Sequence, residues 1–392
     1  MTDDVTTNET TGALAPVPEA EAAAVLDGPA GAMVPLGHST LGPTRGVWRV
    51  TGPGGVRAIL KVVGQRDDER AEASRRQTSY QFWAREPAIL AEGVPAAYRE
   101  AGIRGPRLLA RFERPDRAVA LWLEEAAGRS GADLSIADLA SFARRLGVAQ
   151  GRIAAEGGGT ASVATNAGVP ATAPAWASRA FLRDYAADRP IEPGSSWRLE
   201  PDDPRWDRPS MAVIDRPLRD ALIRLQRERE TFIGWVEAGP RTLAHLDVWP
   251  TNVFVDTDGS VTLIDWAFAG DGALGEDIGN LVPDAVFDLL HPPTLLGALD
   301  EATFAAYVDG LRAAGWTGDE REVRLAMCAS AVKYDCIAAG MLARSDRADQ
   351  TTYGTAPAVS TEELFAVRAT VMRFLAGWAD EARRLAAELG RA

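Results

Sequence analysis

The part of the sequence that decides the fold reads His245-Leu246-Asp247-Val248-Trp249-Pro250-Thr251-Asn252, then Val253-Phe254-Val255, a turn at 256–259, and Val261-Thr262-Leu263-Ile264-Asp265-Trp266. This pattern predicts a loop, a short strand, a tight turn and a second strand. Such a hairpin brings Asn252, which precedes the first strand, close to Asp265, which follows the second. The segment therefore predicts a polar site at one end of a hairpin.

The residue types in this segment indicate a magnesium site with a neighbouring base. Asn252 and Asp265 offer two oxygen ligands to one space, and Mg²⁺ prefers a few protein oxygens together with waters and phosphates. Asp247 lies five residues before Asn252 on the same loop. We expect its carboxylate to accept a proton from an incoming nucleophile.

The same segment resembles the catalytic loop and metal-binding segment of the aminoglycoside phosphotransferase-like kinases, a family of small-molecule kinases that includes the choline kinase type. Their pattern is His-x-Asp-x-x-x-x-Asn, then a hydrophobic strand and Ile-Asp-Trp, and the resemblance covers about residues 33–390. It implies that Asp247 is the catalytic base, that Asn252 and Asp265 hold Mg²⁺, and that His245 is structural. Leu246 stands where the family often has glycine.

The resemblance implies a protein-kinase-like bilobal fold of the α+β class. The patterns along the chain agree with it, because a small antiparallel β lobe with one helix precedes a larger, mainly α-helical lobe. We expect a disordered acidic tail at 1–30, with a short Ala-rich helix at 19–26. A nucleotide-binding lobe is expected at 31–127, and a catalytic and acceptor-binding lobe at 128–392.

Periodicity gives the expected elements of both lobes. The β lobe has strands at 47–50, 56–63, 107–112 and 118–123, and one charged helix at 67–90 that Pro87 kinks. The larger lobe has helices at 134–155, 176–187 and 215–238. Two irregular insertions, at 157–174 and 189–209, are expected to shape the choice of acceptor.

The first lobe supplies candidates for nucleotide binding, again by resemblance. Lys61 lies on a predicted strand, as the phosphate-binding lysine of the family does, and Glu86 is similar to the helix carboxylate that fixes this lysine. Glu124 and Glu125 lie in the segment expected to be the hinge, whose backbone meets the purine base. The glycine-bearing loop at 37–46 is expected to cover the phosphates.

Composition narrows the classes of protein. The chain has 392 residues, of which 46% are hydrophobic, and a net charge of −13 from 55 acidic and 42 basic residues. This acidic excess argues against nucleic acid or an anionic membrane as a partner, and no apolar run approaches the roughly 18 residues of a membrane span. The first Lys or Arg is Arg45, so the N-terminus lacks the basic region of a signal peptide, and we expect a cytoplasmic protein. We also expect no obligatory protein partner. Cys328 and Cys336 are expected to be reduced core residues.

The distribution of charge suggests a class of acceptor. Between Arg241 and Arg312 the chain has twelve acidic residues and no Lys or Arg. One interpretation is an acidic floor beside the active site that favours a cationic acceptor, and the other is an ordinary solvated face. The candidates for acceptor contacts are Trp249, Asp271 and Glu276.

We therefore expect Mg²⁺-dependent transfer of the γ-phosphoryl group of ATP, or GTP, to a hydroxyl of a small molecule, with a cationic antibiotic such as an aminoglycoside as one candidate. The alternatives are a sugar or nucleoside kinase of the same fold and a non-catalytic pseudokinase. A metal hydrolase built on His245, Asp247 and Asp265 is disfavoured because few other ligands are present. A protein kinase is disfavoured because only eleven residues separate Asp265 from Asp277, which we expect to brace the catalytic loop.

Overall fold

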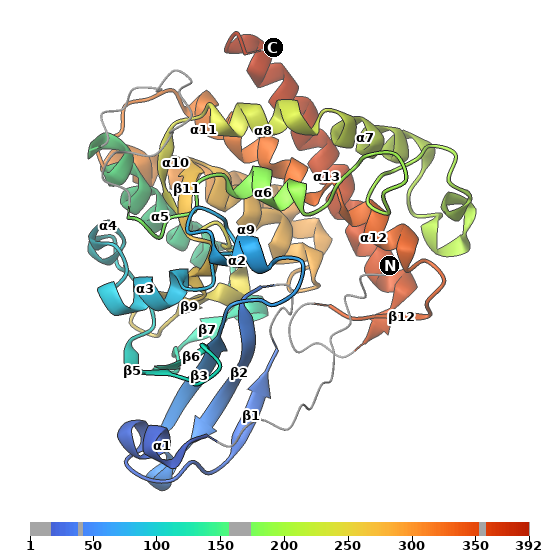
Figure 1. The fold of residues 1–392 in the computed structure, drawn as a ribbon. Coiled ribbons are helices and arrows are strands. Elements are labelled where there is room, and N and C mark those ends of the chain that lie inside the picture. The colour runs from blue at the N-terminus through green and yellow to red at the C-terminus, as the bar shows by residue number, and fades with distance from the viewer. Residues whose placement is uncertain (1–16, 38–41, 157–173, 353–357, 392) are drawn as a thin grey trace.

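The computed structural model describes residues 17–37, 42–156, 174–352 and 358–391. Within these ranges the chain forms a sheet-containing part from its N-terminal third and a larger helical part, which lies above the sheet in Figure 1. This is the α+β arrangement predicted from the sequence.

An antiparallel sheet forms the N-terminal part. Its five strands lie in the order β1-β2-β3-β6-β5, and every neighbouring pair is antiparallel. The central strand, β3, carries Lys61 in register with Val47 on one side and Leu121 on the other. The strands span β1 (Met33–Leu36), β2 (Thr44–Thr51), β3 (Arg57–Val63), β5 (Leu108–Glu113) and β6 (Val119–Leu123).

The predicted tail is too long at its C-terminal end. Residues 1–16 lie outside the described ranges, but α1 (Glu19–Leu26) packs against the sheet. Ala22 and Leu26 are fully buried, and the carboxylate of Glu21 accepts hydrogen bonds from Arg114 (2.9 Å) and from the indole N–H of Trp122 (3.1 Å). The small apolar face of α1 and its one paired acid hold it in place, so the folded part includes this helix.

The predicted long helix at 67–90 is replaced by two short ones, α2 (Ala71–Arg75) and α3 (Arg85–Glu92). Pro87 does not kink a continuous helix. It lies in the first turn of α3, where the backbone N–H groups have no partner within the helix and a proline is tolerated. Glu86 is therefore held in the first turn of α3 as well.

The described residues form three smaller sheets, and two of them contain strands next to the predicted site. One has the order β4-β10-β9-β7, in which β9 (Val253–Val255) and β10 (Val261–Leu263) form the antiparallel hairpin predicted from the sequence. The other pairs β8 (Arg241–Ala244) with β11 (Gly270–Ala273). The remaining short strands are β4 (Ile103–Arg104), β7 (Arg129–Ser130), β12 (Asp349–Gln350) and β13 (Val359–Ser360).

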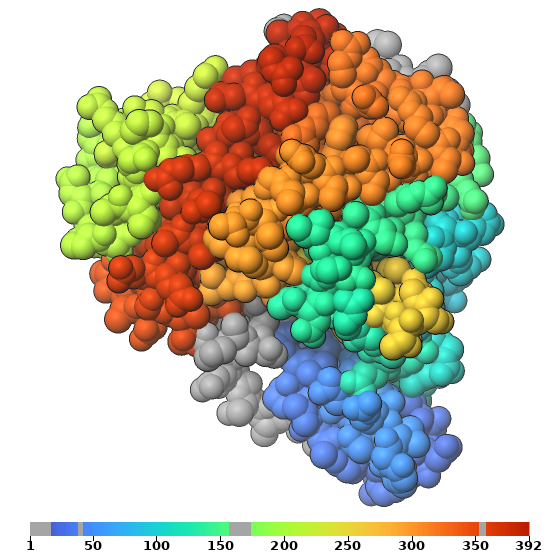
Figure 2. Space-filling model, turned by 180° about the vertical axis from the view of Figure 1, so that it is seen from behind, coloured from blue at the N-terminus to red at the C-terminus, as the bar shows by residue number. Residues whose placement is uncertain are grey.

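Helices make up most of the C-terminal part. The predicted helix at 215–238 is interrupted at Glu228, and that at 176–187 begins only at Phe181. Figure 2 shows α13 as a continuous band across the back of this part, with the narrower sheet region below it. The helices span α4 (Ala96–Glu100), α5 (Ile136–Glu156), α6 (Phe181–Ala187), α7 (Arg216–Arg227), α8 (Arg229–Glu237), α9 (Glu276–Phe287), α10 (Leu296–Ala313), α11 (Glu320–Ala329), α12 (Ile337–Ala343) and α13 (Thr361–Glu388).

The stretch Glu320–Ala343 is long and apolar enough to cross a membrane by length and composition alone. Its most apolar window is 83% buried inside the protein, as in the core helix of a globular fold. It is divided into α11, a 3-10 helix at Ser330–Tyr334, and α12. Cys328 and Cys336 are buried free thiols in this stretch, as predicted.

Candidate functional site

The catalytic loop follows β8 and is held by one carboxylate from α9. Asp277 accepts hydrogen bonds from the backbone N–H groups of His245 (3.0 Å) and Leu246 (2.7 Å). It accepts a third from the side chain of Gln150 on α5 (2.6 Å). The prediction that Asp277 braces the loop is therefore confirmed.

His245 is a buried, neutral part of the loop. Its Nε2 lies 3.0 Å from the carbonyl oxygen of Ile264, and its Nδ1 accepts the backbone N–H of Asp247 (3.3 Å). These partners place the ring proton on Nε2, and burial lowers the pKa of the imidazole. The ring also packs edge-to-face against Trp266. His245 thereby joins the catalytic loop to the end of the hairpin.

Asp247 and Asn252 lie together on this loop. The Asn252 amide donates to the backbone carbonyl of Asp247 (2.9 Å) and to its Oδ2 (3.2 Å). Burial raises the pKa of Asp247 to about 7, with the charges of Asp265 and Asp284 adding to the effect and that of Lys333 opposing it. The carboxylate of Asp247 is thus within electrostatic reach of Asp265, Asp284 and Lys333.

Lys61, Glu86 and Asp265 form one ion-pair cluster across the two parts of the chain. The Lys61 ammonium lies 2.6 Å from Glu86 Oε2 and 2.9 Å from Asp265 Oδ1. Burial lowers the pKa of Lys61, but the two carboxylates outweigh it, so the pKa is raised and the lysine is held charged. Burial likewise raises the pKa of Asp265, yet the attraction to Lys61 keeps it below its usual value.

The residues expected to hold Mg²⁺ fit a hard cation. Asp265 has a left-handed backbone (φ 60°) directly after the hairpin, and the N–H of Ile264 donates to the carbonyl of Asn252 (2.9 Å), so the two residues close the same end of the hairpin. Lys61 engages Oδ1 of Asp265, and the Asn252 amide nitrogen faces Asp247. An amide oxygen and a carboxylate form the donor set that Mg²⁺ prefers.

The hydrolase alternative needs a richer set of ligands. Within the described ranges, no group of three or more His, Cys, Asp or Glu side chains is placed to hold a metal ion.

The hinge segment borders an open cleft of about 570 Å³, within the range of small-molecule sites. Its lining includes Arg57, Glu124, Glu125 and the residues up to Gly128. Glu124 pairs with Arg104, and Glu125 pairs with Arg49 (2.6 Å) and Arg57 (3.1 Å). The side chains of the two hinge acids are thus engaged in ion pairs, which agrees with a role for the backbone in meeting the base. Residues 38–41 of the expected phosphate loop lie outside the described ranges.

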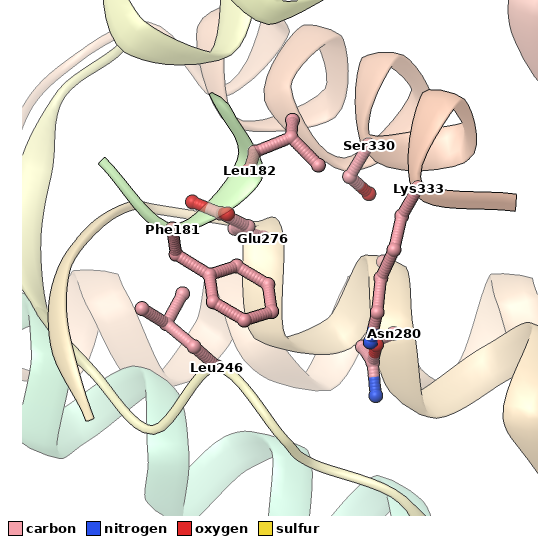
Figure 3. Close-up of a pocket in the computed structure, with 8 residues that line it drawn as sticks. Phe181, Leu182, Leu246, Glu276, Asn280, Ser330 and Lys333 are labelled. Atoms are coloured by element: carbon pink, nitrogen blue, oxygen red, sulfur yellow. The ribbon is translucent and has the colours of Figure 1, made fainter. Parts of the chain in front are cut away.

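The three candidate acceptor residues have different surroundings. Trp249 is half-buried at the start of the 3-10 turn Pro250–Asn252 and remains a candidate. Asp271 is buried on β11 opposite Leu243, and its carboxylate is already paired with Arg241 (3.0 Å), which leaves less of its charge for an acceptor. Glu276 is buried, accepts the N–H of Ala273 (2.9 Å), and lines a small cavity of about 10 Å³ shown in Figure 3.

Six of the twelve acids in the base-free segment are engaged in contacts within the fold. Asp277 braces the loop. Asp256 and Asp258 accept hydrogen bonds from backbone N–H groups of the hairpin turn. Others form ion pairs within the helical part: Asp271 with Arg241, Asp288 with Arg368 and Asp300 with Arg324. These three carboxylates are paired with arginines outside the base-free segment, so fewer acids remain for an acidic floor than the sequence offers, and a cationic acceptor stays a prediction.

Two residues near Asp247 were missed by the sequence analysis. Asp284 is on α9, where burial raises its pKa to about 6, and Lys333 is on the 3-10 helix Ser330–Tyr334. Neither belongs to the motif that carries the resemblance. The signal for Lys333 was present in the composition, because the chain has only two lysines.

Comparison with known proteins agrees with this geometry. The chain matches the family described as "Phosphotransferase enzyme family" over residues 44–317, more than two thirds of its length. The chain belongs to this family. Its members are small-molecule kinases, so the chain is a phosphotransferase by family. The comparison with curated proteins found no significant match.

Solved structures give the same fold. An aminoglycoside phosphotransferase from Alicyclobacillus acidocaldarius is 17% identical, with 94% of this chain and 98% of that chain covered and a TM-score of 0.50. An amicoumacin kinase in complex with AMP-PNP and Ca²⁺ is 12% identical (91% and 92% covered, TM-score 0.48). The choline kinase of Streptococcus pneumoniae is 11% identical (92% and 97% covered, TM-score 0.45). The first of these matches, at a TM-score of 0.50, shows the protein-kinase-like fold, and at 17% identity it shows the fold alone.

Proposed function

We propose that this phosphotransferase is Mg²⁺-dependent and moves the γ-phosphoryl group of ATP, or GTP, to a hydroxyl of a small molecule. The observation that carries the proposal is the convergence of the Lys61–Glu86–Asp265 cluster with the Asp247–Asn252 pair. These residues come from both parts of the chain and face one site. Such a set suits phosphoryl transfer, in which the protein mainly positions groups and neutralises charge.

Each residue has a role in this proposal. Lys61, fixed by Glu86, gives a positive charge to the α- and β-phosphates. Asn252 and Asp265 would hold Mg²⁺, which would supply positive charge to neutralise the charge that develops on the transferred phosphoryl group. Asp247 orients the acceptor hydroxyl and takes its proton. Trp249 follows Asp247 by two residues and would contact the acceptor.

The test is Mg²⁺-dependent release of ADP or GDP with a panel of cationic antibiotics, nucleosides and sugars. Asp247→Ala is expected to lower turnover about 10²- to 10⁴-fold while leaving nucleotide binding intact, because only the base is lost. Asp265→Ala is expected to abolish Mg²⁺-dependent nucleotide binding, measured by calorimetry. Asp258→Asn, a charge change on the exposed hairpin turn, is the matched control and should leave both readouts unchanged.

Two results would contradict the proposal. Full turnover by Asp247→Ala would remove the base from the mechanism, and unchanged nucleotide binding by Asp265→Ala would remove the metal site. If neither nucleotide is turned over, with or without an acceptor, the pseudokinase alternative is favoured instead.

A further inference from the structure

Lysine is nearly absent from this chain. Of its 42 basic residues, 40 are arginines, and the two lysines are Lys61 and Lys333. Lys61 belongs to the ion-pair cluster described above, and Lys333 lies beside Asp247. An ammonium group is compact and its stem is flexible, whereas a guanidinium is a broad, planar fork. Both lysines act on carboxylates of the proposed site, Lys61 through Asp265 and Lys333 through its charge on Asp247, which points to a function for Lys333.

Lys333 is connected to the catalytic loop through one residue, Asn280. Its ammonium donates a hydrogen bond to the side-chain oxygen of Asn280 on α9, as Figure 3 illustrates. The amide nitrogen of Asn280 in turn donates to the carbonyl of Val248 (2.8 Å), the residue after Asp247. Asn280 thus fixes Lys333 relative to the base.

Aromatic rings and carboxylates surround the same ammonium. Lys333 Nζ lies 5.7 Å from the ring centroid of Phe181 and 5.8 Å from those of Tyr185 and Tyr334, within the range of cation–π attraction. The charge of Lys333 also acts on Asp247 and Asp284 and opposes the rise in their pKa values that burial causes. Rings and carboxylates of this kind are what would recognise an ammonium group of a ligand, and here a side chain of the protein occupies the position.

We propose that Lys333 is a specificity-determining residue. Its ammonium fills the cation site beside Asp247, so the acceptor presents a neutral or anionic oxygen group, and not an ammonium, next to the hydroxyl that is phosphorylated. This inference rests on the proposed function. Within the described part of the chain, Asn280 is the one hydrogen-bond acceptor that Lys333 engages, so its other N–H groups can donate to an oxygen of the acceptor.

The first test uses acceptors built on one sugar ring that carry a positive, no or a negative charge. Glucosamine, glucose and glucuronate are assayed together with every acceptor active in the panel above, using wild type, Lys333→Met and the charge-matched control Arg321→Met. In wild type we expect lower KM values for the neutral or anionic acceptors. In Lys333→Met we expect their KM to rise roughly 10- to 100-fold, the scale of one hydrogen bond to a charged group, with a smaller change in kcat.

The second test needs no turnover. Lys333→Ala, or Lys333→Ser if the first variant does not fold, removes the ammonium and leaves its surroundings in place. We expect n-butylammonium to raise the Tm of the truncated variant but not that of wild type, because only the variant has an open cation site. The uncharged analogue n-butanol should not do so.

The outcomes separate this inference from the proposed function. Lowest KM values in wild type for amine-bearing acceptors would overturn the inference while leaving phosphoryl transfer intact. Equal effects of n-butylammonium on wild type and on the truncated variant would overturn it as well. If no acceptor is phosphorylated, the proposed function fails, and the n-butylammonium measurement still decides whether Lys333 occupies a cation site.

Discussion

Leu246 has a positive φ of 65° in the catalytic loop. A side chain in this left-handed region costs about 1–2 kcal/mol, and glycine avoids that cost. The conformation persists here because Asp277 accepts the N–H groups of both His245 and Leu246, and because the Leu246 side chain is buried in the core. Leu246 therefore holds this conformation through the contacts of its neighbours and the burial of its own side chain.

Glu276 gives a pH-dependent contribution to stability. Burial raises its pKa from 4.5 to about 7, so the folded state binds the proton more tightly than the unfolded state does. The contribution is fully present below pH 4.5 and is lost as the pH rises through 7, with a maximum of about 3 kcal/mol. In Glu276→Gln the amide oxygen can still accept the N–H of Ala273, but the titration is removed. Urea unfolding at pH 5.5 and 8.5 should therefore show a larger loss of stability in wild type than in this variant.

Glu301→Gln is the control, because Glu301 is exposed. Its stability should follow that of wild type at both pH values. If Glu276→Gln also follows wild type, the Glu276 carboxyl titrates as it does in the unfolded chain and the prediction is wrong.

At the scale of the elements, the position of α3 depends on one buried arginine. Arg85, the first residue of α3, uses all five of its N–H donors on backbone carbonyls. The acceptors are Gln77, Ser79, Tyr80, Trp176 and Ala267. Ala267 lies two residues after Asp265, and Glu86 follows Arg85. Arg85 therefore joins the helix that carries Glu86 to the turn that carries Asp265.

Arg85→Lys should separate these two segments. One ammonium cannot reach the carbonyls of residues 77–80, Trp176 and Ala267 together, so some of these buried carbonyls lose their hydrogen bond. We expect a loss of about 2–4 kcal/mol in unfolding free energy and a higher KM for ATP, with kcat less affected. Thermal unfolding and nucleotide kinetics would measure the two effects. Arg75→Lys on the exposed face of α2 is the control. An unchanged KM for ATP in Arg85→Lys would show that Arg85 is purely structural.

Sequence patterns predicted the hairpin, the four longer strands of the main sheet and the order of the two parts, because these depend on local alternation and turn residues. They did not predict the interruption at Glu228. That break coincides with contacts from distant segments: Glu228 pairs with Arg383 of α13, and Arg229 forms a buried ion pair with Asp335 (2.6 Å). The motif singles out Asp247, Asn252 and Asp265, whose roles stay predictions, whereas no sequence pattern singles out Arg85, Asp284 or Lys333, which tertiary packing brings near them.

Across the whole molecule, lysine is so rare that the amines of the proposed site can be labelled almost without competition from other side chains. The chain has 40 arginines and two lysines. An amine-selective reagent can therefore react only with Lys61, Lys333 and the α-amino group of the purified chain. Lys61 is 6% exposed and its pKa is raised by its two carboxylate partners, so little of it is free amine. Lys333 is half-buried. The molecule as a whole should therefore take up very few labels while folded.

We expect acetylation at pH 8, followed by intact mass and peptide mapping, to modify the α-amino group first, Lys333 next and Lys61 last. Lys61 should react at least about ten-fold more slowly than the α-amino group, because one pKa unit alone removes nine tenths of the free amine and burial adds to this. In Glu86→Gln the rate at Lys61 should rise, since one of its two charge partners is lost, while the rate at Lys333 should not change. Equal rates at Lys61 and the α-amino group in the folded wild type would mean that the Lys61–Glu86–Asp265 cluster is open in solution, and the nucleotide site would then have to assemble only when nucleotide binds.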